Sequence, residues 1–129
     1  MTGMDILLVE PDIVLAETLR RAVNGAGHRV RIARTAQMAV EAVDTAVPEL
    51  IILELQMVSH SGIEFLYELR SYHDWQDIPV VILSHVPPGE FSGSWQLLRE
   101  ELGVRAYHYK SRTSLKKLLG VVNQFVVVS

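Results

Sequence analysis

The stretch that most constrains the fold of this chain is residues 50–62, Leu-Ile-Ile-Leu-Glu-Leu-Gln-Met-Val-Ser-His-Ser-Gly. It begins with large apolar residues, reaches one carboxylate at Glu54, and then passes through a polar turn that ends at Gly62. An apolar run bounded by a loop is typical of a strand that is buried on both faces of a parallel sheet. Because α/β sheets carry their chemistry at the carboxyl ends of such strands, Glu54 is the first residue whose presence needs an explanation.

The rest of the chain alternates between strand-like and helix-like patterns. Strands are predicted at residues 6–9, 29–33, 50–54, 80–83 and 104–109. The intervening segments place apolar residues at helical spacing, with predicted N-caps at Asp12, Thr35 and Thr113 and, on one face of the last helix, Leu115, Leu118, Leu119, Val122 and Val126. Residues 85–93 are rich in proline and glycine and are predicted to be a loop. This alternation predicts an α/β fold with a parallel sheet, right-handed crossovers and helices on both faces.

Composition limits the classes of function. The chain has 129 residues, of which 49% are hydrophobic, so we expect residues 1–129 to form a single domain. A formal net charge of −3 without any basic block argues against nucleic acid as a partner. The absence of cysteine excludes a disulfide framework and a thiol nucleophile, and it suits a reducing cytoplasm. We find neither a signal peptide nor a stretch that could cross a membrane, so a cytoplasmic location without a membrane partner is expected.

If the sheet is doubly wound, the ends of the first, third, fourth and fifth strands meet near one crevice. The residues that arrive there are Glu10, Pro11, Asp12, Glu54, Ser84, His85 and Lys110. Carboxylates, a hydroxyl and a lysine could together bind Mg²⁺ and a phosphate group. A buried lysine–glutamate pair that satisfies itself explains the same residues equally well.

Several blocks of the sequence occur together in one known family. They are residues 6–10, 50–54 and 78–84, with Met57, Gly62, Gly103, Tyr107 and Lys110 at matching spacing. Through these residues the chain resembles, over nearly its whole length, the receiver domain of bacterial two-component response regulators. The resemblance implies a CheY-like, flavodoxin-like (βα)5 fold with a doubly wound five-stranded parallel sheet and the strand order 2-1-3-4-5.

The resemblance also implies roles for individual residues. In the family, an aspartate after the third strand accepts a phosphoryl group from a histidine kinase, and Mg²⁺ is held by that aspartate and two acids after the first strand. The positions match as follows: the phosphoacceptor is Glu54, the first metal acid Glu10, the metal-facing backbone carbonyl Gln56, the phosphoryl ligands Ser84 and Lys110, and the switch aromatic Tyr107. In the family this aromatic swings together with the hydroxyl and changes a binding face.

The sequence departs from the family pattern mainly at the positions that carry out phosphoryl transfer and metal binding. Glu54 replaces the aspartate, and its extra methylene moves the carboxylate away from the position for in-line attack. Pro11 replaces the second metal acid, and Asp12 is better placed to cap a helix than to replace it. His85 stands where the family prefers a small residue, so its imidazole is expected to crowd a phosphodonor. Val58 also replaces a usual proline.

We therefore interpret the chain as an atypical, or pseudo-, receiver that is not an enzyme. The hypothesis is that Glu54 pairs with Lys110 and holds one conformation without phosphorylation; the alternative is a decayed site in which the pair is only structural. No cofactor is expected, and Mg²⁺ would bind only if the site works, with Glu10 and Glu54 as weak candidate ligands. Two other functions stay open: a conventional Mg²⁺-dependent phosphoacceptor, and a small flavodoxin-like enzyme or nucleotide binder, although the turn after the first strand has no glycine-rich phosphate cradle.

The expected partner is another protein or a second copy of the chain. It would bind the face formed by the fourth helix, the fifth strand and the last helix, with Trp95, Tyr107 and Lys116 as candidate contacts. A histidine kinase or a covalently linked output domain are further candidate partners. Five histidines are scattered along the chain: we expect surface or loop positions for His28, His73 and His108, and a minor possibility is a weak transition-metal site formed by Glu54 with His60 and His85.

Overall fold

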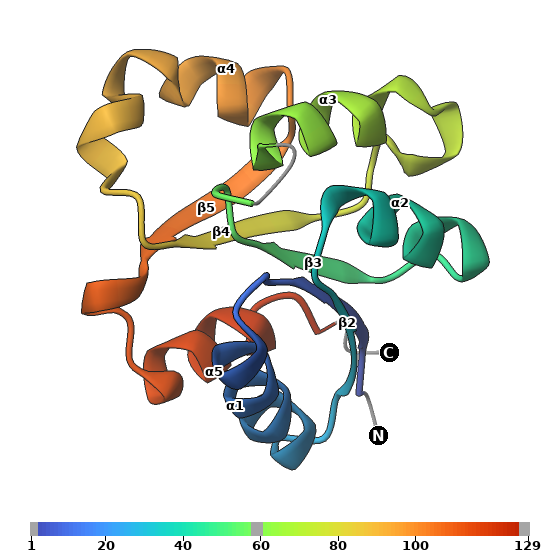
Figure 1. Cartoon of the computed structure of the whole chain (residues 1–129), viewed down its shortest axis with the longest axis vertical. Coiled ribbons are helices and arrows are strands. Elements are labelled where there is room, and N and C mark those ends of the chain that lie inside the picture. Colours follow the sequence, from blue (N-terminus) through green and yellow to red (C-terminus); the bar gives the residue numbers. More distant parts are fainter. Residues whose placement is uncertain (1–2, 58–60, 127–129) are drawn as a thin grey trace.

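The computed structural model describes residues 3–57 and 61–126. Its sheet has five parallel strands in the order β2-β1-β3-β4-β5, as predicted (Figure 1). The strands are β1 (Asp5–Val9), β2 (Arg29–Ala33), β3 (Leu50–Leu53), β4 (Val80–Ser84) and β5 (Val104–Tyr109). The doubly wound α/β fold is therefore confirmed.

Two helical layers enclose this sheet. The helices are α1 (Ile13–Gly25), α2 (Ala36–Thr45), α3 (Gly62–Ser71), α4 (Trp95–Glu100) and α5 (Leu115–Asn123), and short 3₁₀ turns lie at η1 (His73–Trp75), η2 (Pro88–Ser94) and η3 (Lys110–Arg112). Helices α1 and α5 cover one face of the sheet, and α2, α3 and α4 cover the other (Figure 1). Alternate residues of each central strand enter the two cores, which is why these strands read as continuous apolar runs.

The register of the sheet brings the site residues to one edge. Val9 at the end of β1 lies beside Leu53 at the end of β3, and Leu53 lies beside Ile82 of β4. Ser84 ends β4 beside Tyr109, the last residue of β5. The residue after each of β1, β3 and β5 therefore emerges at the same edge as the last residue of β4, as expected for parallel strands.

The helix N-termini follow the predicted caps with one exception. Asp12 and Thr35 accept hydrogen bonds from the backbone N–H groups of Leu15 and Met38, as predicted. The prediction that Thr113 caps the last helix is wrong, because Ser114 accepts from Lys117 N instead. The Thr113 hydroxyl donates to the Tyr109 carbonyl 2.8 Å away and so closes the η3 turn.

Three further differences concern the ends of elements. Helix α5 ends at Asn123, so Val126 lies beyond the helix, because the last turn tightens into i→i+3 hydrogen bonds to Val121 and Val122. The predicted loop after β4 contains the η2 turn. Strand β3 stops at Leu53, one residue before Glu54.

The positions expected for the histidines are partly wrong. His28 lies in the loop between α1 and β2, as expected, but it is buried: its Nδ1 accepts from Met4 N at 3.1 Å, and its Nε2 lies 3.3 Å from Asn123 Oδ1. His108 lies half-buried on β5 rather than on the surface, and burial lowers the pKa of its imidazole. His73 is exposed, as expected. The predictions for Val58 and His60 lie outside the described residues.

Candidate functional site

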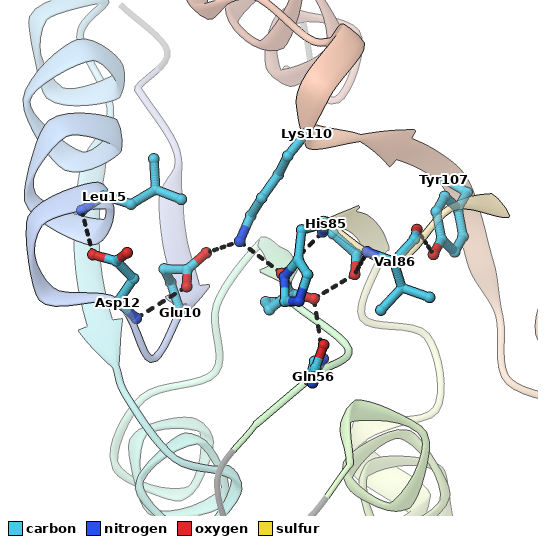
Figure 2. Close-up of polar contacts among 10 residues, drawn as sticks. Glu10, Asp12, Leu15, Gln56, His85, Val86, Tyr107 and Lys110 are labelled. Carbon is cyan, nitrogen blue, oxygen red and sulfur yellow. Dashed lines mark hydrogen bonds and ion pairs between the residues drawn. The ribbon is translucent and has the colours of Figure 1, made fainter.

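Four polar side chains meet at the carboxyl edge of the sheet (Figure 2). Glu10 follows β1, Glu54 follows β3, Ser84 ends β4, and Lys110 follows β5. The two glutamates and Ser84 are almost completely buried, and the Lys110 side chain is 16% exposed. Groups of this kind are rarely buried unless they are paired, so the contacts among them decide what the site can do.

The Glu54 carboxylate accepts hydrogen bonds from every side. Its Oε1 atom accepts from Lys110 Nζ at 2.6 Å, from His85 N at 3.1 Å and from His85 Nδ1 at 2.8 Å. Its Oε2 atom accepts from Gln56 N at 3.0 Å and from Ser84 Oγ. A carboxylate offers about four lone-pair sites, and these donors occupy all of them.

The same donors keep Glu54 ionised. Burial alone would raise the pKa of this carboxyl, but the hydrogen bonds from Lys110 and Ser84 and from the backbone N–H groups of Gln56 and His85 lower it to about 2. At neutral pH the side chain is therefore an anion that can only accept hydrogen bonds.

Lys110 bridges the two buried glutamates. Its Nζ atom lies 2.6 Å from Glu10 Oε1 and 2.6 Å from Glu54 Oε1 (Figure 2). Burial alone would lower the pKa of this ammonium, but the hydrogen bonds to the two glutamates raise it above its usual value. The predicted pairing of Glu54 with Lys110 is thus present, and Glu10 joins it as a second acceptor whose contact with the lysine was not predicted.

The turn after β1 holds the carboxylate of Asp12 away from the Glu54–Lys110 pair. Pro11 lies in the bend, and the backbone N–H of Asp12 donates to Glu10 Oε2 at 3.0 Å. The Asp12 carboxylate turns to the helix and accepts from Leu15 N at 3.0 Å, and its side chain is exposed. Asp12 is therefore a helix cap, as the sequence favoured, and not a third acid of the pocket.

These residues do not fit the Mg²⁺ that the family resemblance implies. Glu10 and Glu54 already hold the Lys110 ammonium between them, and Pro11 has no carboxylate. Gln56 enters the site through its N–H, which donates to Glu54. Among residues 3–57 and 61–126, no three His, Asp or Glu side chains are grouped so that they could hold a metal ion. A divalent cation would have to displace the lysine.

A chain of hydrogen bonds leads from Glu54 to the fifth strand. Ser84 Oγ donates to Glu54 and accepts from Val86 N at 3.1 Å. The Val86 carbonyl accepts from the Tyr107 hydroxyl at 2.6 Å (Figure 2). Burial raises the pKa of the Tyr107 phenol, so the hydroxyl stays protonated and donates. The aromatic residue predicted to act with Ser84 is thus connected to it through Val86.

The candidate partner residues differ in their exposure. Trp95 is half-buried and packs against the core under α4, and Tyr107 packs against the same core. Lys116 is exposed on α5. In the described part of the chain, no helix is long and apolar enough to cross a bilayer.

Comparison with known proteins gives a family match. The sequence model described as "Response regulator receiver domain" matches residues 6–88. The KDP operon transcriptional regulatory protein KdpE of Escherichia coli is 39% identical over 80 residues, which are 62% of this chain and 34% of that protein. The response regulator MprA of Mycobacterium leprae is 33% identical over 81 residues, or 63% of this chain and 35% of that protein. These matches span about a third of the length of either relative.

Solved structures agree on the fold. The chemotaxis response regulator CheY4 of Vibrio cholerae superposes with a TM-score of 0.82 at 19% identity, over 96% of this chain and 99% of that one. The Mn²⁺-bound form of the response regulator Rcp1 gives a TM-score of 0.79 at 24% identity, over 98% of this chain and 97% of that one. At these identities the similarity concerns the fold alone.

Proposed function

Because this chain belongs to the response regulator receiver domain family, we propose that it is a two-component signalling module that takes no phosphoryl group at Glu54 and acts through protein–protein contacts. In this proposal residues 1–129 work as one receiver-like domain in the cytoplasm, with neither enzymatic activity of their own nor a bound cofactor. Since the matched relatives are about three times as long as the matched segment, a linked output domain is part of the same proposal.

The observation that carries this proposal is the state of the Glu54 carboxylate. A phosphoacceptor must offer a lone pair to phosphorus, and the lone pairs of Glu54 are occupied by Lys110, Ser84, His85 and the Gln56 backbone. The side chain is also almost completely buried, at 1% exposure. An incoming phosphodonor would have to break several charge-assisted hydrogen bonds before it reached an oxygen atom.

The cation of the pocket supports the proposal independently. Phosphoryl transfer to a carboxylate brings additional negative charge into the site, and a metal ion usually neutralises it. Here the position between Glu10 and Glu54 holds the ammonium of Lys110. The lysine therefore supplies a positive charge between the two glutamates without an added ion, and its hydrogen bonds satisfy one oxygen of each carboxylate without phosphorylation.

The output side of the proposal is the face formed by α4, β5 and α5. Hydrogen bonds lead from Glu54 through Ser84 and the Val86 backbone to Tyr107 on β5. We propose that the Glu54–Lys110 pair keeps Tyr107 on the Val86 carbonyl and so presents one conformation of this face constantly to a protein partner or to a second copy. Replacement of Glu54 by Gln is then expected to weaken binding of that partner, and an unchanged affinity would leave the pair with a purely structural role.

The direct test is incubation with Mg²⁺ and acetyl phosphate followed by intact mass measurement. We expect no phosphoryl adduct on Glu54 in the native protein and an adduct in the double variant Glu54→Asp, Pro11→Asp, which restores the acids of the family pattern. The double variant is the positive control for the assay. A hydroxylamine-sensitive adduct on Glu54 of the native protein would overturn the proposal in favour of a working phosphoacceptor.

A further inference from the structure

His85 is held on the buried carboxylate by two hydrogen bonds. Its backbone N–H donates to Glu54 Oε1 at 3.1 Å, and its ring Nδ1 lies 2.8 Å from the same oxygen (Figure 2). The carboxylate is 1% exposed, whereas the histidine side chain is 55% exposed. The imidazole therefore has one ring nitrogen on the buried Glu54 carboxylate while more than half of the histidine side chain is exposed.

The partner of Nδ1 determines the tautomer of the ring. Glu54 is ionised at neutral pH, because its pKa is about 2, and an ionised carboxylate cannot donate. Nδ1 must therefore carry the proton, and in the neutral ring Nε2 carries the lone pair. No hydrogen bond joins Nε2 to any residue within the described ranges. A carboxylate on the opposite ring nitrogen orients an imidazole and fixes its tautomer.

The other nucleophilic groups of the pocket are not available in this way. Ser84 is completely buried, and its Oγ is engaged by Glu54 and Val86 N. Lys110 is an ammonium ion with a raised pKa, so its nitrogen has no lone pair to offer. At this edge of the sheet, His85 Nε2 is thus the exposed nitrogen with an uncommitted lone pair.

We propose that His85 Nε2 is a phosphoryl-acceptor site of this protein. The inference rests on the proposed function in one respect: it takes this chain, as a member of the receiver domain family, to work in two-component signalling, where a phosphodonor is a reaction partner. The donor class is a phosphoramidate, such as a phosphohistidine, or an acyl phosphate. Transfer from one imidazole to another exchanges one P–N bond for another, so it is close to reversible and suits a relay.

The bond changes balance without an additional reactant. The Nε2 lone pair forms the new N–P bond. The nitrogen of the phosphoramidate is already protonated (–NH3+) at neutral pH, so its P–N bond breaks with the electron pair staying on that nitrogen, which leaves as ammonia. Nε2 has no proton to lose. The Nδ1 proton stays in place, and the ring becomes a phosphorylated imidazolium whose positive charge lies 2.8 Å from the Glu54 carboxylate.

The test treats the whole protein with potassium phosphoramidate and follows intact mass, with the site mapped by peptide mass spectrometry under alkaline conditions. We expect one phosphoryl adduct that is labile in acid and stable in alkali, as a P–N bond is. It should be absent from His85→Gln and present in His73→Gln, where the replaced histidine is exposed and makes no hydrogen bond to a described carboxylate. Glu54→Gln should slow the reaction roughly ten- to a hundredfold, because a neutral amide stabilises the imidazolium less.

The outcomes separate this inference from the proposed function. If the native protein gains no adduct, or if His85→Gln keeps it, the role of His85 is overturned while the proposed function is unaffected. If the adduct is instead sensitive to alkali and hydroxylamine and disappears in Glu54→Gln, Glu54 itself is the acceptor and both proposals fail. Circular dichroism of each variant establishes that a lost adduct does not reflect unfolding.

Discussion

The Nζ atom of Lys110 lies 2.6 Å from Oε1 of Glu54, a residue 56 positions earlier in the chain. The contact forms because β3 and β5 end at the same edge of the sheet. It pairs a carboxylate that is 1% exposed with an ammonium, and the same ammonium also forms an ion pair with Glu10. The three buried charged groups, Glu10, Glu54 and Lys110, therefore stabilise the fold only together, since removal of Lys110 leaves two uncompensated buried charges.

Replacement of Lys110 by Met tests whether the lysine is the resident cation. The variant leaves Glu10 and Glu54 facing each other without a positive charge, so we expect the free energy of unfolding to fall by about 3 kcal/mol. A divalent cation could then bind between the carboxylates, and Mg²⁺ or Mn²⁺ should restore part of the stability. Urea unfolding with and without the metal measures both effects.

The control for this prediction is Lys116→Met, which removes an exposed lysine from α5. Neither this variant nor the native protein should respond to the metal. A native protein whose unfolding midpoint rises with Mg²⁺ would contradict the assignment of Lys110 as the cation of the pocket.

The free energy of unfolding should fall at acidic pH as Glu54 becomes protonated. Folding lowers the pKa of Glu54 to about 2 from its ordinary value of 4.5, so the ionised form stabilises the native state above about pH 4.5. This contribution, of order 3 kcal/mol, is lost as the pH falls from about 4.5 toward 2. Glu54→Gln cannot titrate, so its stability should change less than that of the native protein over this range. Chemical unfolding at several pH values measures the difference, and parallel curves would show that Glu54 is not the source.

The sequence predicts the secondary-structure elements that surround this site better than the side-chain contacts within it. The apolar runs and the caps at Asp12 and Thr35 specify the elements, because burial on both faces of a strand leaves a continuous pattern that can be read locally. The strand order followed from the family resemblance and not from the pattern of any one strand. Side-chain partners depend on how chain segments approach in space. The ion pair of Glu54 with Lys110 was predicted, but two other contacts were therefore not: the ion pair of Glu10 with Lys110 and the hydrogen bond between His85 and Glu54.

The partners of other buried polar residues could not be predicted from the sequence either. His28 lies in a loop, as expected, yet it is buried and joins Met4 and Asn123, which are far from it in sequence. Arg70 has the position of an ordinary charged residue in the last turn of α3. Its guanidinium donates instead to the carbonyls of Leu102, Trp75 and Ile78 at 2.8–2.9 Å. Every residue has a backbone carbonyl, so the sequence does not indicate which carbonyls accept hydrogen bonds from Arg70.

Tyr107→Phe should loosen the link between the pocket and β5. The variant removes the hydroxyl that donates to the Val86 carbonyl at 2.6 Å, so we expect a loss of about 1 kcal/mol in stability. Amide hydrogen exchange at Val86, Gly89 and Glu90, the residues of the segment 86–90 that carry a backbone N–H, should accelerate, because the segment after β4 loses an anchor. Tyr109→Phe, on the same strand, is the control and should leave this exchange unchanged. Unaltered protection of residues 86–90 in Tyr107→Phe would mean that the hydroxyl does not hold the segment.

Gly103→Ala should destabilise the turn between α4 and β5. Gly103 has a φ of +66°, which a side chain disfavours by about 1–2 kcal/mol, and an added Cβ would lie 2.8 Å from a terminal nitrogen of Arg70. Because Arg70 donates to carbonyls of this turn, its displacement adds to the loss. Gly120→Ala is the opposite control: no atom lies within 4 Å of its added Cβ in α5, and alanine should stabilise the helix by about 0.5–1 kcal/mol. Thermal unfolding should therefore move in opposite directions for the two variants, and a shift of the same sign in both would show that the Arg70 contact does not constrain Gly103.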